Sequence, residues 1–295
     1  MAKSADYYPT NPNLKHRDSV FTLLFSEPTV LRELYSAIEG IILPHDIPVS
    51  INTLSDVHYR KQINDISFTI DNRLVVLIEH QSSINENMPL RLLEYIWRIY
   101  EKITYRQKVY KTKLVKIPKP EFIVLYNGVE PYPDYKEMRL SEAFKDASDL
   151  KTTDINSQSL ELVVQVYNIN SGHNPELLQR SETLGNYSSF IGKIREYKES
   201  GSSLEEAMKT AIEYCIEHGI LKLFLEEHSS EVINMLYTEF NLDEAKEVWH
   251  EEGYEEGIEE IARNALAKGY PVEEISDITG LDLEKIKLLS QEKLH

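Results

Sequence analysis

The chain has 295 residues, 41% of them apolar, and carries a net charge of −17. That length predicts one or two domains, and the apolar content is ample for a buried core. The longest aliphatic run, Leu74 to Ile78, is far short of the roughly 20 residues that span a bilayer, and no charged-then-apolar leader opens the sequence. We therefore expect a soluble, cytoplasmic protein with no membrane partner. A single cysteine, Cys215, excludes an intramolecular disulfide and a Cys-rich zinc site.

The negative charge lies in the second half of the chain. Residues 1–150 hold 19 Lys+Arg and 20 Asp+Glu, a net charge of −1, whereas residues 151–295 hold 13 and 29, a net charge of −16. Within the first half, Arg98 to Lys119 contain eight basic residues and one acidic residue, or +7 in 22 residues. A local patch of this kind can bind phosphate whatever the net charge of the whole protein. The composition therefore does not exclude a nucleic-acid partner.

Asp18 opens the first predicted helix. Apolar residues then recur at steps of three and four, as on one helix face: Val20, Leu23, Leu24, Val30, Leu31, Leu34 and Ile38. A carboxylate at the start of a helix favours a capping role for Asp18; a role in a functional site is the alternative, and His16 is a weaker candidate still. Pro44 to Pro48 break the chain, and the extended run from Val49 to Gln62 is predicted to be the first strand.

A β-hairpin is predicted next. Two runs rich in Val, Ile and Phe, Ile66–Ile70 and Leu74–Ile78, flank the turn-forming Asp71-Asn72-Arg73. If the hairpin is centred on Asn72, residues equally distant from Asn72 face each other, so Asp65 lies opposite Glu79. A two-residue turn would instead shift the pairing by one residue.

The facing pair has a chemical meaning. Directly opposed side chains in a hairpin lie about 4.5–5.5 Å apart at Cβ, and two carboxylates at that distance repel unless a cation lies between them. Oxygen ligands suit Mg²⁺ or Mn²⁺. Alternation along the strand adds Gln81 to the face of Glu79 and turns His80 to the other face. The hairpin thus offers Asp65, Glu79 and Gln81 as one cluster, with solvated flanking charges as the alternative interpretation.

Pro89 suits the first turn of a helix that runs to about Lys108. One stripe of this helix is apolar and is predicted to face the core: Leu92, Ile96, Ile99 and Ile103. The neighbouring stripe is cationic and aromatic: Arg91, Tyr95, Arg98, Lys102 and Arg106. A solvated surface and a DNA-binding surface are both consistent with it. Arg91 is the best DNA-binding candidate, because it is nearest in sequence to Gln81 and its guanidinium can bind phosphate through two hydrogen bonds.

Two more strands are predicted, Glu121–Tyr126, closed by Asn127-Gly128, and Leu160–Tyr167. From about Asn174 the pattern is helical. The predicted helices are Glu176 to Lys198, a helix opened by Ser203 with a capping box to Glu206, and Ser229 to Phe240.

The last segment has the pattern helix, turn, helix, turn, helix between Ile258 and Leu289, with Gly269 and Gly280 at the breaks. It follows an acidic run, His250–Glu260, which is typical of a solvated helix or linker. A DNA-reading helix-turn-helix is one interpretation. Residues 270–295 carry six acids and three lysines, however, a balance that disfavours an approach to phosphates. We favour a protein-contact module.

Several stretches of the first half resemble a known family: HRDSVFTLLFSEP from His16, IEHQSS from Ile78, MPLRLLEYIWRIYEK from Met88 and FIVLYNG from Phe122. Together with the order Asp, strand turn, Glu-x-Gln, they resemble the Rpn-type recombination-promoting nuclease and putative transposase family of the PD-(D/E)XK nuclease superfamily. The resemblance covers about the first half of the chain. Asn64 stands where the superfamily name has Pro.

This resemblance implies a Mg²⁺-dependent DNA endonuclease. Asp65 and Glu79 would be its metal ligands, Gln81 would replace the usual Lys, and Asp18 would be an accessory acid on the first core helix. Because Gln81 is neutral, it can orient a water or a phosphate by hydrogen bonds but brings no positive charge to the transition state.

We therefore expect an α/β fold: a PD-(D/E)XK nuclease core with a central mixed sheet flanked by helices, followed by an all-helical C-terminal half. The predicted divisions are a nuclease-like domain at 1–170, a helical region at 171–249 and an acidic helical tail at 250–295. The expected function is phosphodiester hydrolysis with Mg²⁺ or Mn²⁺, in recombination, transposition or defence. DNA is the expected partner, with homo-oligomers formed through the helical half. A catalytically inactive nuclease fold that binds DNA or protein is the alternative.

Overall fold

The computed structural model of the chain describes residues 19–52, 65–145 and 159–291. It divides into two compact units, Met1–Tyr237 and Thr238–His295. The first unit contains a six-stranded sheet and the second is helical. The predicted mixed α/β fold with a helical C-terminal half is thus confirmed.

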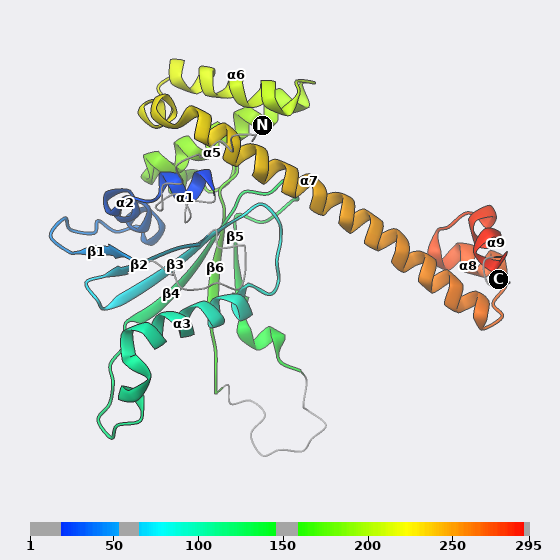
Figure 1. Ribbon diagram of the computed structural model, residues 1–295, viewed down its shortest axis with the longest axis horizontal. Helices are drawn as coiled ribbons and strands as arrows, with labels where there is room; N and C mark the ends of the chain where they lie inside the picture. The colour runs from blue at the N-terminus through cyan, green and yellow to red at the C-terminus, as the bar shows by residue number, and fades with distance from the viewer. Residues whose placement is uncertain (1–18, 53–64, 146–158, 292–295) are drawn as a thin grey trace, which may run out of the picture. The chain divides into compact units, whose positions relative to one another are not determined.

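The sheet has the strand order β1-β2-β3-β4-β6-β5 (Figure 1). Its strands are β1 (Val49–Ile51), β2 (Asp65–Ile70), β3 (Leu74–Gln81), β4 (Lys119–Tyr126), β5 (Tyr135–Arg139) and β6 (Val163–Asn168). β3 pairs with β4, and β4 with β6, in parallel, while the other neighbours are antiparallel. The C-terminal ends of β3, β4 and β6 therefore meet at one edge of the sheet.

The hairpin β2–β3 has the predicted register. Asp65 lies opposite Glu79 and Phe68 opposite Val76, so the hairpin is centred on Asn72. Asp71 and Asn72 both adopt left-handed backbone conformations, with φ of 51°. Asp and Asn tolerate this region better than other residues with a side chain. The local sequence of the turn thereby fixes which side chains of the two strands share a face.

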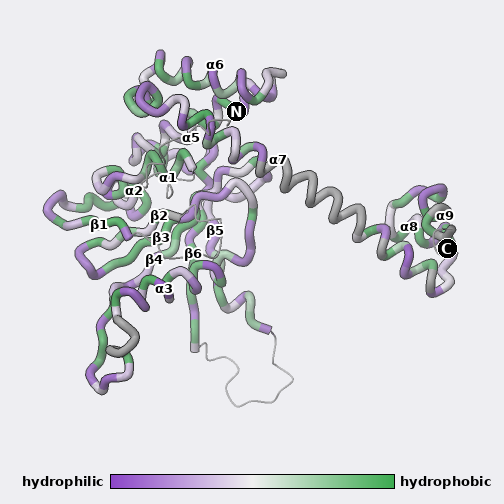
Figure 2. Tube along the Cα trace, viewed as in Figure 1, coloured by the Kyte–Doolittle hydropathy of each residue, from purple (hydrophilic) through white to green (hydrophobic). Residues whose placement is uncertain are grey.

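Helices cover both faces of the sheet (Figure 1). α3 (Met88–Val109) packs on one face through buried residues that include Met88, Leu92, Ile96 and Ile99. On the other face lie α1 (Val20–Leu24), α2 (Pro28–Glu39) and α5 (Glu182–Glu199). Figure 2 shows hydrophobic residues concentrated along the central strands, which these helices enclose. The central strand β3 is consequently buried from Val75 to Glu79.

Four elements differ from the sequence prediction. The predicted helix Glu176–Lys198 is two helices, because the chain breaks at Ser181, whose side chain caps the second one. The first predicted helix is two, because Pro28 cannot continue α1 and instead occupies the first position of α2. β5 was not predicted: it is an edge strand with Met138 as its one buried residue, which leaves little apolar alternation. Most of the predicted strand Val49–Gln62 lies outside the described residues.

The remaining elements are η2 (Leu140–Ala143), α4 (Pro175–Arg180), α6 (Leu204–Glu217), α7 (Lys222–Ala267), α8 (Val272–Thr279) and α9 (Leu283–Gln291). The capping box of Ser203 and Glu206 at the start of α6 is confirmed. The predicted helix Ser229–Phe240 and the acidic run are both parts of α7. None of the helices in the described part of the chain is long and apolar enough to cross a membrane.

The second unit has the predicted order helix, turn, helix, turn, helix. Gly269 and Gly280 take φ values of 80° and 73°, which end α7 and α8. A small core joins the three helices: Ala262, Ile275, Ile286 and Leu289. The assignment of this unit to protein contact stays a prediction.

The loop after β4 is tightly packed at Gly128. A Cβ there would lie 2.2 Å from the carbonyl oxygen of Ser82 and 2.4 Å from the hydroxyl oxygen of Tyr126. Both distances are far below van der Waals contact. The exits of β3 and β4 are therefore held together by a close approach that only glycine allows.

We expect Gly128→Ala to lower the free energy of unfolding by about 2 kcal/mol, because the added methyl group must displace backbone. Gly192→Ala in α5 is the matched control: a Cβ at that position meets nothing within 4 Å, so alanine should stabilise the helix by about 0.5–1 kcal/mol. Urea denaturation measures both effects. Equal stability of the two variants would contradict the close approach at Gly128.

Candidate functional site

Glu79 is a buried carboxylate near the end of β3. Its side chain is 2% exposed, within a strand that is otherwise apolar from Val75 to Ile78. Burying a charge is costly unless the charge is paired and hydrogen-bonded. Both oxygens have partners: Nη2 of Arg91 donates to Oε1 at 2.9 Å, and Nε2 of Gln81 donates to Oε2 at 2.9 Å. Glu79 thus holds a compensated negative charge inside the fold.

Arg91 reaches Glu79 from the first turns of α3. Its side chain is 34% exposed, so the guanidinium extends from solvent to the buried carboxylate. Nη2 also donates to the hydroxyl oxygen of Tyr95 at 3.3 Å, one helical turn further along. The sulfur of Met88 lies 2.7 Å from Nε2 of Gln81 and 3.6 Å from Nη1 of Arg91. The start of α3 and the end of β3 therefore form one polar cluster.

Asp65 is the residue opposite Glu79 in the hairpin. The backbone register is as predicted, although the side chain of Asp65 lies outside what the structure describes. The alternation is also confirmed: Gln81 contacts Glu79 on the α3 face, and His80 points to the opposite face. Asp18 lies outside the described residues as well.

The residues present are compatible with a hard divalent cation, under one condition. Glu79 and Gln81 supply side-chain oxygens of the kind that Mg²⁺ and Mn²⁺ prefer, and the backbone register places Asp65 opposite Glu79. The buried carboxylate of Glu79 is stable only with a positive charge beside it. Arg91 supplies this positive charge in the structure. A metal ion at Glu79 would therefore have to share the carboxylate with the guanidinium or displace the guanidinium. The described residues contain no group of three or more His, Cys, Asp and Glu side chains suited to a metal.

His80 has a structural environment. Its ring stacks on Phe21 with the centroids 4.8 Å apart, and its Nε2 lies 3.2 Å from the hydroxyl oxygen of Tyr187. Burial of the ring and the positive charge of Arg195 lower the pKa of His80 to about 3. The ring is therefore neutral near pH 7, and it joins β3 to α1 and α5.

Sequence reasoning missed a second arginine at this edge. Arg195, on α5, donates from Nη1 to Oδ1 of Asn127 at 3.1 Å and to Oδ1 of Asn170 at 2.7 Å, and from Nη2 to the carbonyl of Asn127. The backbone N–H of Asn127 in turn donates to the carbonyl of Gln81 at 2.8 Å. Arg195 thereby helps to fix the end of β3. Asn127-Gly128 was the one available signal, and the sequence pattern indicated only a strand terminator.

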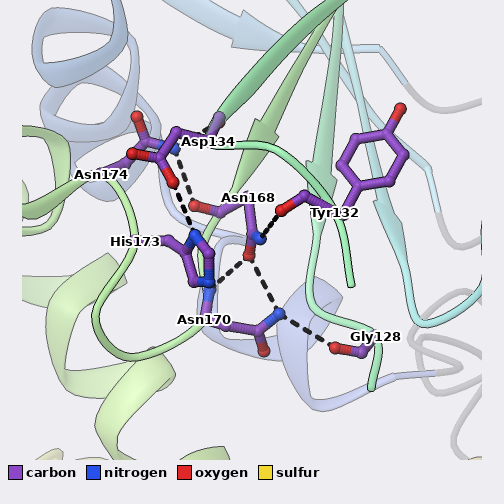
Figure 3. Close-up of polar contacts among 7 residues, drawn as sticks. All are labelled: Gly128, Tyr132, Asp134, Asn168, Asn170, His173 and Asn174. Atoms are coloured by element: carbon purple, nitrogen blue, oxygen red, sulfur yellow. Dashed lines mark hydrogen bonds and ion pairs between the residues drawn. The ribbon is translucent and has the colours of Figure 1, made fainter. Parts of the chain in front are cut away.

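An asparagine network continues along the edge from Arg195 (Figure 3). Asn168, at the end of β6 and 1% exposed, donates to the carbonyl of Tyr132 at 2.9 Å. Its Oδ1 accepts from the backbone and side chain of Asn170 at 3.1 and 2.9 Å, and Asn170 donates to the carbonyl of Gly128 at 2.9 Å. These bonds connect the loops after β4 and β6. The network supports the edge of the sheet at which β3 ends with Gln81.

Only part of the predicted cationic stripe of α3 lies beside Glu79. Arg91 and Tyr95 contact Glu79 and each other, whereas Arg98 pairs with Glu94 on its own helix. Lys102 is exposed further along α3, and the side chain of Arg106 lies outside the described residues. The stripe therefore leads away from Glu79 along the helix.

Residues 45–184 match the model of a family described as "Putative transposase, YhgA-like". The match contains all six strands and α3, and with them Asp65, Glu79, Gln81 and Arg91. The resemblance to a putative transposase family is confirmed over these residues, whereas the place of the chain in the PD-(D/E)XK superfamily stays a prediction. No curated protein and no solved structure matches the chain.

We expect Arg91→Met to lower the free energy of unfolding by about 2–3 kcal/mol, because it leaves the carboxylate of Glu79 buried without a cation. Glu79→Gln should cost less, since Arg91 is partly exposed and can be rehydrated while the amide keeps hydrogen bonds. Urea denaturation at low ionic strength, without divalent ions, measures which of the two variants loses more free energy of unfolding. Equal losses in the two variants would show that burial of the Glu79 charge is not what makes Arg91 necessary.

Proposed function

We propose that the chain is a metal-dependent DNA endonuclease that hydrolyses phosphodiester bonds. The observation that carries the proposal is the buried carboxylate of Glu79 opposite Asp65, on adjacent strands of a sheet whose residues match a transposase family. A structural ion pair could be placed anywhere in a core. This one lies at the edge where three parallel strands end, beside a partly exposed guanidinium.

The residues have distinct roles in this proposal. Asp65 and Glu79 would hold Mg²⁺ or Mn²⁺, which when bound supplies positive charge to the phosphoryl oxygens and lowers the pKa of a coordinated water. Gln81 holds Oε2 of Glu79 and so orients the carboxylate. Arg91 lies between Glu79 and solvent, where the same guanidinium can bind either the carboxylate or a DNA phosphate. Arg195 keeps the backbone of Gln81 in place through Asn127.

The helical C-terminal half would serve protein contacts, including homo-oligomer formation. Its second unit has its own core and an acidic first turn on α8, with Glu273 and Glu274. That charge favours a protein partner over DNA.

An inactive nuclease fold that binds DNA or protein is the second candidate. One observation favours it: Arg91 already compensates the charge of Glu79, as a cation would. Gln81 in place of the superfamily's Lys is consistent with the same view. The two candidates differ in whether divalent ions bind and whether DNA is cut.

We expect Asp65→Asn and Glu79→Gln each to abolish Mg²⁺-dependent nicking of supercoiled DNA, because they remove the negative charge that holds a hard cation. Each variant should also lose the increase in melting temperature that Mn²⁺ gives the wild type. DNA binding should persist, and Gln81→Lys should preserve or raise activity. A wild-type protein that neither gains thermal stability with Mn²⁺ nor nicks DNA would support the inactive module instead.

The α3 stripe should contact the DNA backbone. If the stripe neutralises about four phosphates, it contributes roughly −3.6 to the slope of log affinity against log salt concentration, and removing the charges of Arg98 and Lys102 should flatten that slope by about 1.8. Lys209→Gln with Lys222→Gln is the matched control, since both lysines lie on other helices and are 55% and 53% exposed. Fluorescence anisotropy over a salt series measures the slope. An unchanged slope in the α3 variant would exclude this face.

A further inference from the structure

The segment between α3 and β4 exposes apolar side chains that the fold does not use. We name residues 109–118 the basic finger. It carries Tyr110 and Leu114, with 89% and 82% of their surfaces exposed, and Ile117 and Val109, the last residue of α3, are also exposed. Leaving large apolar side chains in water is unfavourable, and a cluster of them indicates an interaction surface.

The basic finger is anchored at its base. The hydroxyl of Tyr100 on α3 donates to the carbonyl of Pro118 at 2.7 Å, and the backbone N–H of Lys119 donates to the carbonyl of Arg73 at 2.9 Å. Figure 1 shows the segment that follows α3 projecting beyond the sheet. The finger is therefore a projection whose base is held by hydrogen bonds, and its exposed apolar side chains are not part of the core.

The charge of the basic finger selects one kind of partner. Lys111, Lys113 and Lys116 alternate with the apolar residues, and residues 109–119 contain no Asp or Glu. Within the described part of the chain, no acidic side chain pairs with these three lysines. The finger also continues the +7 run that begins at Arg98. Lysines spaced between apolar side chains match the alternation of phosphates and bases in a nucleic acid.

We propose that the basic finger is a second DNA contact, in which Tyr110 and Leu114 insert against the bases while Lys111, Lys113 and Lys116 bind the flanking phosphates. This inference rests on the proposed action on DNA. Apolar side chains that enter the minor groove partly unstack a base step and bend the duplex. The finger would thus bind the duplex at a point away from Glu79 and bend the duplex at that point.

The test measures binding of the full-length chain to a labelled duplex without divalent ions, so that cleavage does not intervene. Tyr110→Ser with Leu114→Ser should weaken binding at least about tenfold, because the stacking of a single base on an aromatic side chain is worth that much affinity, and should leave the salt slope unchanged. Replacing the three lysines by Gln should flatten the slope by about 2.7. Leu223→Ser is the matched control, since Leu223 lies on α7 and is 80% exposed; it should bind as the wild type does.

A second readout separates base insertion from a general loss of affinity. 2-Aminopurine placed in the duplex should brighten when wild-type protein unstacks it, and should not brighten with the Tyr110/Leu114 variant at saturation. Unchanged affinity and unchanged fluorescence in that variant would overturn the proposal. So would finger variants that bind DNA normally but lose binding to phosphatidylserine vesicles, or that change the oligomeric state in ultracentrifugation.

The nuclease proposal can fail separately. If the wild type never nicks DNA but the finger variants lose binding, the finger stands and the endonuclease does not. If the wild type nicks DNA and the finger variants bind and unstack DNA as the wild type does, the endonuclease proposal stands and the finger proposal does not.

Discussion

The ion pair between Glu79 and Arg91 is the interaction on which the rest of the candidate site depends. A carboxylate that is 2% exposed requires a positive charge beside it, and the fold supplies one from the start of α3 at 2.9 Å. The ion pair therefore connects the start of α3 to the end of β3. It also places Met88, Gln81 and Tyr95 around the same pair. A buried pair of this kind contributes little net stability compared with apolar packing, which supports a functional reason for its position.

The end of β3 is held from both faces by guanidinium groups. Arg91 contacts Glu79 on the α3 face, while Arg195 on α5 fixes Asn127, whose backbone bonds to Gln81. Between them, Gly128 allows the two strand exits to approach closely. The strand end is thus held by contacts from several elements, and in the function that we propose such placement of the reacting groups would contribute to the catalytic rate. Among the described residues, the contacts of the basic finger lie at its base, which is consistent with the duplex contact that we propose for it.

The sequence predicted what depends on local patterns. The hairpin register followed from the turn at Asn72, and strand alternation then separated Gln81 from His80. Contacts between distant segments carried no such signal: Arg195 is 68 residues from Asn127, and nothing in either stretch indicates the other. Arg91 was predicted to bind DNA from its position near Gln81, and that stays a prediction; its pairing with Glu79 could not be predicted, because it depends on how α3 docks on the sheet. β5 was missed because an edge strand with one buried residue lacks the apolar alternation by which strands are recognised.

In the function that we propose, Glu79 is a cation-binding position that Arg91 fills when no metal is bound. The most direct test is a calorimetric titration of Mn²⁺ into wild type, Arg91→Met and Asp65→Asn, each shown to be folded. If a guanidinium and a divalent ion compete for Glu79, Arg91→Met should bind Mn²⁺ more tightly than the wild type, and Asp65→Asn more weakly than either. Mn²⁺ binding that is equal or weaker in Arg91→Met, or that does not depend on Asp65, would contradict the account.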